Sequence, residues 1–203
     1  MIRLAGVDLS LTSTGIARLE LDDDGAVTGS RTEVVTGPAL SKDAPWDERA
    51  ERVRLQSLRV CDALLPILDR RPPDLIVVEG ASFGSNRPGA SELHGLRWRT
   101  YATLSRHGAT LVEVAPKTLK LYVTGDGGAP KPLVVQAIRR HYGDRFDLPL
   151  RKADGLEDVA DATGLVAMGA RSIGHPIDLD HPHRTRGMRS PKWVTLRGRT
   201  TCP

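Results

Sequence analysis

The seven residues from Asp74 to Gly80, DLIVVEG, constrain the fold more than any other stretch of the chain. Four consecutive apolar residues stand between a charged residue at one end and Glu79 with Gly80 at the other. A run without alternation is typical of a strand that is buried on both faces, as in the centre of a sheet with helices on each side. We therefore expect an α/β protein with a carboxylate at the end of a central strand.

Apolar patterns on either side of this strand predict the order of the other elements. Three strands come first, at 2–7, 15–21 and 26–36, with the acidic turn DDDG between the last two. Another strand is expected at 109–114, and helical spacing predicts helices at 46–70, 90–108, 117–122, 131–142 and 155–171. The expected fold class is α/β, with a mixed five-stranded sheet in which three antiparallel strands come first and parallel strands follow, flanked by helices.

Composition limits the class of protein. A chain of 203 residues with 39% hydrophobic and 27% charged residues is ordinary for one domain with an appendage. Its start does not resemble a secretory leader, and no apolar stretch approaches the roughly 20 residues of a membrane helix. Cys61 and Cys202 suggest neither a disulfide framework nor a zinc site. We expect a cytoplasmic protein that does not contact membranes.

The net charge of +4 is concentrated at the carboxyl end of the chain. From Arg171 onward there are seven Lys or Arg against two Asp, whereas the preceding chain carries 22 basic and 23 acidic residues. Prolines and weak periodicity in this segment are typical of an extended arm that adds non-specific affinity for phosphates, and its histidines do not have zinc-site spacing. We therefore expect a folded domain over 1–171 and a basic, extended tail over 172–203.

Four carboxylates are expected to lie near one another. Asp8 and Glu79 each end an apolar run, and ligands of open α/β sheets bind at the carboxyl ends of strands. Asp158 and Asp161 are three residues apart on the last helix, so they project from the same face. Like charges packed against a sheet are costly unless a cation lies between them. Magnesium prefers such oxygen ligands, and two ions can hold the attacking and leaving oxygens of a phosphodiester displacement.

Each carboxylate also has an ordinary structural explanation. Asp8 alone could cap a turn, Glu79 could pair with an arginine, and the two helical aspartates could be surface charges. The four together favour a functional site.

A glycine-rich segment, TGDGGAP at 124–130, lies between Lys120 and Lys131. Such a loop lets backbone amides approach a phosphate, and flanking lysines supply positive charge. The ordinary alternative is a flexible connector with solvated lysines. The loop alone gives weak support for phosphate binding.

Taken in order, these segments resemble the RuvC-type Holliday-junction resolvases, nucleases of the ribonuclease H-like superfamily. The resemblance covers roughly Ile2 to Arg171 and is carried by GVDLSLTSTGIA, LIVVEG, VAPKTLKLYVTGDGGAPKPLV and EDVADATGLVA. It implies a ribonuclease H-like nuclease domain over 1–171 and a metal-dependent endonuclease that makes paired nicks in branched DNA. It also implies a homodimer and two Mg²⁺ ions, for which Mn²⁺ is expected to substitute.

The resemblance also assigns roles to individual residues. By it, Asp8, Glu79, Asp158 and Asp161 are the metal-binding carboxylates, and Lys120 and Lys131 approach the scissile phosphate. Members of this family carry an aromatic side chain in the loop after the strand-ending glutamate, where it wedges into an opened junction. Phe83 lies in the corresponding loop here. The residues expected to contact DNA are Phe83, Arg87, Arg97, Arg99, Lys117, Lys120 and Lys131.

Other functions remain open on sequence alone. A nuclease of the same fold could cut flaps or single strands, or the chain could be a catalytically silent DNA-binding module. The first motif also resembles the phosphate loop of actin- and Hsp70-like proteins, but 203 residues leave no room for their second lobe. Four retained carboxylates argue against the silent module, because without a metal they only repel one another.

Overall fold

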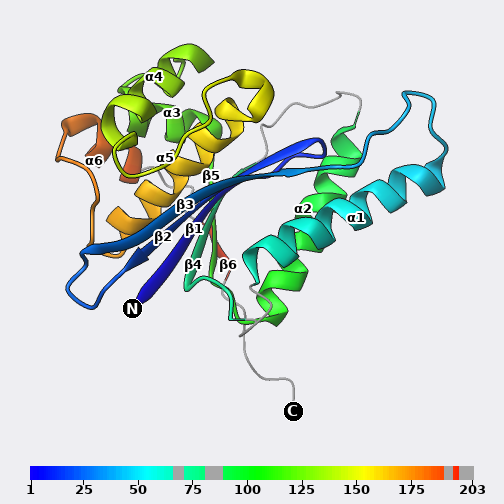
Figure 1. Cartoon of the computed structure of the whole chain (residues 1–203), viewed down its shortest axis with the longest axis horizontal. Coiled ribbons are helices and arrows are strands. Elements are labelled where there is room, and N and C mark those ends of the chain that lie inside the picture. The colour runs from blue at the N-terminus through cyan, green and yellow to red at the C-terminus, as the bar shows by residue number, and fades with distance from the viewer. Residues whose placement is uncertain (66–70, 81–88, 190–193, 197–203) are drawn as a thin grey trace.

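A mixed six-stranded sheet forms the centre of the molecule (Figure 1). The computed structural model describes residues 1–65, 71–80, 89–189 and 194–196. Its strands lie in the order β3-β2-β1-β4-β5-β6, with β1, β2 and β3 antiparallel and β1, β4 and β5 parallel. They are β1 (Ile2–Asp8), β2 (Ser13–Leu21), β3 (Val27–Thr36), β4 (Leu75–Glu79), β5 (Leu111–Val114) and β6 (Val194–Leu196). The five expected strands are confirmed, and β6 is an addition.

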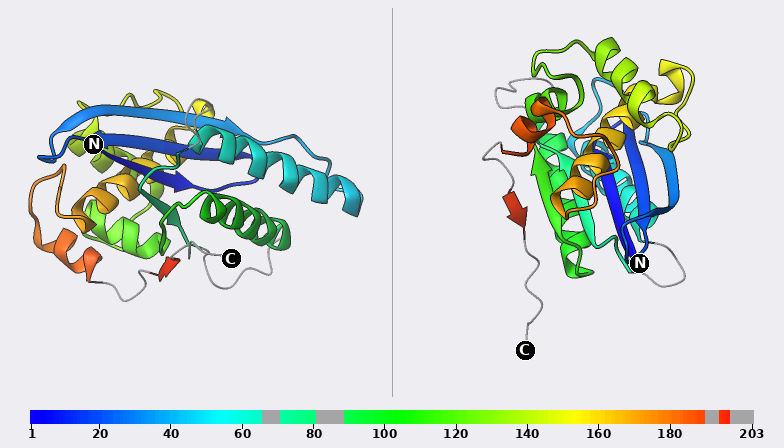
Figure 2. Two further views of the ribbon diagram at one scale, coloured as in Figure 1. Left: turned by 90° about the horizontal axis from the view of Figure 1, so that it is seen from below. Right: turned by 90° about the vertical axis from the view of Figure 1, so that its left-hand side faces the viewer.

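Helices cover both faces of this sheet, as Figures 1 and 2 show. The pair α1 (Trp46–Leu64) and α2 (Ala90–Arg106) packs together on one face. The other face carries α3 (Pro116–Thr124), α4 (Lys131–Tyr142), α5 (Leu156–Ser172) and α6 (Pro182–Met188), with a short 3₁₀ helix at Lys152–Asp154 before α5. Within the described residues, no helix is both long and apolar enough to cross a membrane.

The central strand β4 is buried on both sides, as its sequence predicts. Leu75 and Val77 belong to the core formed with α3, α4 and α5, while Ile76 and Val78 belong to the core formed with α1 and α2. Because alternate residues of a strand share a face, Glu79 follows Leu75 and Val77 on the α5 side. The end of the strand is thereby directed toward α5.

β1 lies between β2 and β4, so the two strand-ending carboxylates are neighbours. Val7 pairs with Val78 across the parallel β1–β4 ladder, and Asp8 pairs with Gly15 across the antiparallel β1–β2 ladder. Asp8 shares the strand face of Leu4, which packs in the α5 core. Asp8 and Glu79 therefore end adjacent strands on the same side of the sheet.

Two glycines let α5 lie directly on the sheet. A Cβ added at Gly6 would stand 2.0 Å from the carbonyl oxygen of Ala162, and one at Gly15 would stand 2.2 Å from that of Asp158. No side chain fits in either gap, so the helix backbone rests on the strand backbone there. These contacts set the height of α5 above the ends of β1 and β2.

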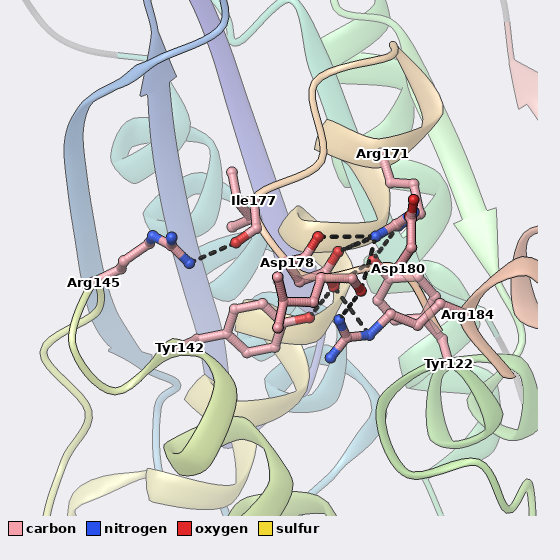
Figure 3. A network of polar contacts seen from close by, with 9 residues as sticks. Tyr122, Tyr142, Arg145, Arg171, Ile177, Asp178, Asp180 and Arg184 are labelled. Carbon is pink, nitrogen blue, oxygen red and sulfur yellow. Dashed lines mark hydrogen bonds and ion pairs between the residues drawn. The ribbon is translucent and has the colours of Figure 1, made fainter. Parts of the chain in front are cut away.

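The segment beyond residue 171 is not a wholly extended tail, which corrects the expectation from its composition. It contains α6 and β6, and Ile177 packs in the α5 core. Asp178 fastens this segment to the domain through polar contacts that α3, α4 and α5 provide (Figure 3). We call these residues the Asp178 cluster: Tyr122, Tyr142, Arg171, Asp178 and Arg184.

The contacts of Asp178 are short and numerous. Its carboxylate accepts hydrogen bonds from the Tyr122 hydroxyl at 2.7 Å, the Tyr142 hydroxyl at 2.5 Å and Arg171 Nη2 at 2.6 Å. Arg184 Nε lies 3.3 Å from the same carboxylate. Composition could not reveal this anchoring, because its partners come from helices 36 and 56 residues earlier in the chain.

Candidate metal centre

Three of the four predicted carboxylates converge at the carboxyl ends of β1 and β4. Asp8, Glu79 and Asp161 each offer an oxygen atom, and these atoms all lie within 4.8 Å of one another. Asp8 and Glu79 are half-buried, and Asp161 is buried on the sheet-facing side of α5. We refer to these three residues as the acidic centre.

Burial and mutual repulsion make the ionised form of this centre unfavourable. Burial is the largest cause that holds the pKa of Asp8 well above its ordinary value, and the charges of Glu79 and Asp161 raise it further. Burial also raises the pKa of Glu79, with Asp161 as the next cause. The pKa of Asp161 is raised by burial as well, although Lys131 opposes the shift.

Lys131 is the cation paired directly with the acidic centre among the described residues. It is the first residue of α4, and its Nζ contacts the Asp161 carboxylate. Burial lowers the pKa of Lys131, but the charges of Asp161, Asp8 and Glu79 outweigh that effect and raise it overall. One ammonium group cannot balance three carboxylates, so a deficit of positive charge remains.

Asp158 lies beside the acidic centre but is held differently. Its Oδ2 accepts a hydrogen bond from Ser13 Oγ at 2.5 Å. Its charge still contributes to the raised pKa of Asp8 and of Asp161, so the carboxylate is close to both. Three of the four predicted carboxylates therefore form the acidic centre, and the fourth, Asp158, lies beside it and is hydrogen-bonded to β2.

The donor set fits a hard divalent cation. Its atoms are carboxylate oxygens from three elements, which is the ligand chemistry of magnesium and related ions. Over the part of the chain that the structure describes, no other group of three His, Cys, Asp or Glu side chains meets so closely, the tail histidines included. The expected convergence of carboxylates is confirmed for Asp8, Glu79 and Asp161.

The glycine-rich loop forms a defined turn between α3 and α4. Gly125 ends α3 with a φ of +87°, and Asp126 Oδ1 accepts a hydrogen bond from the amide of Gly128 at 2.7 Å. A Cβ at Gly127 would approach the carbonyl oxygen of Lys117 at 3.0 Å. Asp126 therefore serves the turn, as its Asp-Gly sequence suggests, and the loop directs Lys131 toward Asp161.

The other predicted lysines are both on α3. Lys120 is half-buried, and its charge lowers the pKa of Asp161, so it stands close to that carboxylate. Lys117 is exposed at the start of the same helix. Both positions remain compatible with contact to a DNA backbone.

Arg97 is a correction, because this residue, expected to contact DNA, is buried beneath the carboxyl end of β4. It is 6% exposed, and its Nη1 donates to the main-chain carbonyl of Glu79 at 2.6 Å. The same atom lies 3.3 Å from Tyr101 Oη and 3.3 Å from Glu113 Oε1. Arg97 thus supports the end of β4 from the α2 side and has no surface to offer a phosphate.

The remaining predicted DNA contacts fall into two groups. Arg99 is exposed on α2, next to Trp98, which is 64% exposed and packs edge-on against Tyr101. Phe83 and Arg87 lie outside the described residues. The wedge assigned to Phe83 and the contact assigned to Arg87 stay predictions.

Two supporting residues were not anticipated from the sequence. Ser13 binds Asp158, and the fully buried Gln56 of α1 donates to Ser10 O at 3.1 Å in the loop after Asp8 and to Thr14 Oγ1 at 3.2 Å at the start of β2. The signal for Ser13 was its spacing: it stands two residues before Gly15 and so shares the strand face that meets α5.

Comparison with known proteins connects this geometry to a family. No family model matches the chain. It is 31% identical over 145 residues to the crossover junction endodeoxyribonuclease RuvC of Chlorobaculum parvum, spanning 70% of this chain and 72% of that protein. The Thermus thermophilus RuvC structure has a TM-score of 0.60 at 22% identity and covers 88% of this chain and 100% of that one. T. thermophilus RuvC in complex with Holliday junction substrate gives a TM-score of 0.56 at 19% identity, with the same coverage.

The structural likeness confirms the expected ribonuclease H-like fold, and the acidic centre lies at the carboxyl ends of two neighbouring strands of that fold. The sequence likeness is more specific, since it extends over most of both chains. The chain belongs to the RuvC family of crossover junction endodeoxyribonucleases. The actin-like alternative is therefore not favoured.

Proposed function

We propose that this chain is a Mg²⁺-dependent endonuclease that resolves Holliday junctions by paired nicks, acting as a cytoplasmic homodimer. The observation that carries the proposal is the acidic centre, in which three carboxylates meet within 4.8 Å and one lysine is paired with them. The name of the C. parvum relative and the junction-bound T. thermophilus structure support the choice of substrate.

The four carboxylates would hold two Mg²⁺ ions, with Mn²⁺ able to substitute. Asp8 is central, because its charge interacts with those of Glu79, Asp161 and Asp158. Glu79 and Asp161 would hold one side and Asp158 the other. When bound, such ions activate a water molecule and stabilise the attacking and leaving oxygens of the displaced phosphodiester.

Lys131 and Lys120 supply the positive charge that the chain itself contributes. Lys131 is bound to Asp161, and Lys120 lies close enough to act on the same carboxylate. Both lysines flank the glycine-rich turn that faces the site. In this position they would stabilise the charge that develops on the phosphate oxygens during cleavage. Lys117 and Arg99, both exposed, would bind the DNA backbone outside the site.

The test is cleavage of labelled four-way junction, flap, single-stranded and linear duplex DNA in Mg²⁺ by the wild type and by Asp8→Asn and Glu79→Gln. We expect symmetrical nicks in the junction, lost in both variants and retained in Asp62→Asn, which changes an exposed carboxylate on α1. Full cleavage by Asp8→Asn would overturn the proposal. If only flaps or single strands were cut, the proposed metal centre would be supported, but the proposed specificity for junctions would be wrong.

Binding of the junction without cleavage of any substrate would instead favour the catalytically silent module. The dimer is tested separately by sedimentation of the full chain with and without junction DNA. A monomer under both conditions would remove the paired-nick mechanism, because two nicks at symmetrical positions need two centres.

A further inference from the structure

Ser13 is placed to act on Asp158. It is the first residue of β2 and shares the face of that strand with Gly15, where the α5 backbone touches the sheet at Asp158. Gly15 thus brings the helix to the strand, and Ser13 Oγ donates to Asp158 Oδ2 at 2.5 Å from the same face. The two residues define both the height of the helix and the orientation of the carboxylate.

The backbone that carries Ser13 is fixed from several directions. Ser13 pairs with Thr36 of β3, and the amide of Gly37 donates to Thr12 O at 2.8 Å. Gln56 reaches across from α1 and donates to Val35 O at 3.1 Å and to Thr14 Oγ1 at 3.2 Å. Ser13 is therefore a rigid donor rather than a surface hydroxyl that finds Asp158 by chance.

A hydrogen bond to a metal-binding carboxylate restricts which of its oxygens meets the ion. By donating to Oδ2, Ser13 fixes the orientation of the Asp158 carboxylate, which would then help to hold a cation near Asp8, whose pKa the charge of Asp158 already raises. Partners of this kind orient the ligands of metal sites, and their removal typically costs 10- to 100-fold in metal affinity or activity.

We propose that Ser13 is a positioning residue that holds the Asp158 carboxylate for the second metal ion. The inference rests on the proposed function, because it concerns the same site. It does not require the cleaved DNA to be a Holliday junction.

The test measures Mn²⁺ binding to the DNA-free full chain by titration calorimetry, with no dependence on cleavage. We expect Ser13→Ala to weaken Mn²⁺ binding about 10-fold. Ser13→Thr keeps the hydroxyl and should stay near the wild type. Ser30→Ala is the matched control. Ser30 lies on β3, toward the end away from Thr36 and Ser13, and its hydroxyl donates to Arg145 O.

A second measurement separates positioning from a general structural role. In the Asp158→Asn background, Ser13→Ala should cause no further loss of Mn²⁺ affinity, because the group it acts on is gone. An equal loss in both backgrounds, unchanged binding by Ser13→Ala, or no Mn²⁺ binding by the wild type would each overturn the inference. Ser13-dependent Mn²⁺ binding without any DNA cleavage would overturn the proposed function and leave this inference intact.

Discussion

Asp178 and Asp161 are both buried aspartates, but the chain surrounds them differently. The Asp178 side chain is 2% exposed and is met by two arginines and two tyrosine hydroxyls. The Asp161 side chain is 7% exposed, is paired with Lys131, and faces Asp8 and Glu79. One region completes its charge balance within the chain, and the other leaves a deficit that an external cation can fill.

The difference separates a structural carboxylate from a functional one. A buried charge is tolerated when hydrogen bonds and opposite charges satisfy it, as in the Asp178 cluster. In the acidic centre the cost of burying negative charge is only partly offset by opposite charge. The carboxylates therefore repel one another in the folded state, and a bound metal ion would relieve that repulsion. Uncompensated negative charge at the ends of two strands thus indicates a functional site, whereas burial of an aspartate alone does not.

The largest expected effect comes from opening the Asp178 cluster. Asp178→Ala leaves Arg184 and part of Arg171 buried without their partner, so we expect a loss of about 3–5 kcal/mol in the free energy of unfolding. Urea denaturation measures it. Asp180→Ala is the matched control, because Asp180 also pairs with Arg171 but its side chain is 91% exposed, which limits the effect to about 1 kcal/mol or less. If Asp178→Ala and Asp180→Ala lost similar amounts of unfolding free energy, Asp178 would not be a structural carboxylate.

The next effect in size is stabilisation by metal. An ion that binds only the folded chain raises its free energy of unfolding by about 2.7 kcal/mol at a concentration 100 times its dissociation constant. We expect this gain for the wild type with Mn²⁺ and little of it for Asp8→Asn, by thermal denaturation against a chelator control. The Asp178→Ala variant, where it folds, should keep the gain. Equal gains in wild type and Asp8→Asn would remove the acidic centre as the binding site.

The smallest effect concerns pH in the absence of metal. The pKa values of Asp8, Glu79 and Asp161 are raised by folding, so above about pH 4, where unfolded Asp and Glu ionise, the folded state holds more protons. The contribution of these three carboxyl groups to the free energy of unfolding should therefore fall as pH rises from about 4 toward neutrality. Lys131 does not reverse this trend, because its raised pKa keeps its stabilising charge constant over that range.

Asp8→Asn tests this pH dependence. Removing one repelling charge should flatten the profile and make the metal-free variant more stable than the wild type at pH 7, because burial and the neighbouring carboxylates disfavour the ionised form of Asp8. Urea denaturation in chelator between pH 4 and 7 measures both quantities. A variant that is less stable than the wild type throughout would show that Asp8 has a structural role instead.

Sequence patterns predicted the parts of the site that depend on period and order. The apolar run before Glu79 specified a strand buried on both faces, and strand order made Asp8 its neighbour. The three-residue spacing placed Asp158 and Asp161 on one face of α5. It could not indicate that Asp158 turns to Ser13, because that contact depends on the height of the helix over Gly15.

Long-range polar contacts were the parts that sequence could not predict. Arg97 belongs to a residue type that is usually exposed, but its guanidinium donates to the Glu79 carbonyl and to Glu113, which are 18 and 16 residues away in the chain. The tail likewise has a composition typical of an extended segment, but its contacts with Tyr122 and Tyr142, 56 and 36 residues before Asp178, hold it against the domain. Local patterns do not contain this information, because the partners are distant in the chain.

The pairing of β6 with β5 has a consequence for how far the chain can be truncated at its carboxyl end. β5 is a short strand on one side of the sheet, and β6 pairs antiparallel with it from Leu111 to Glu113. Without that partner, β5 would present a row of open N–H and C=O groups to any other copy of the chain. With β6 in place, the outermost strand on that side has three residues, whereas a chain shortened to 1–171 would expose the four residues of β5 instead.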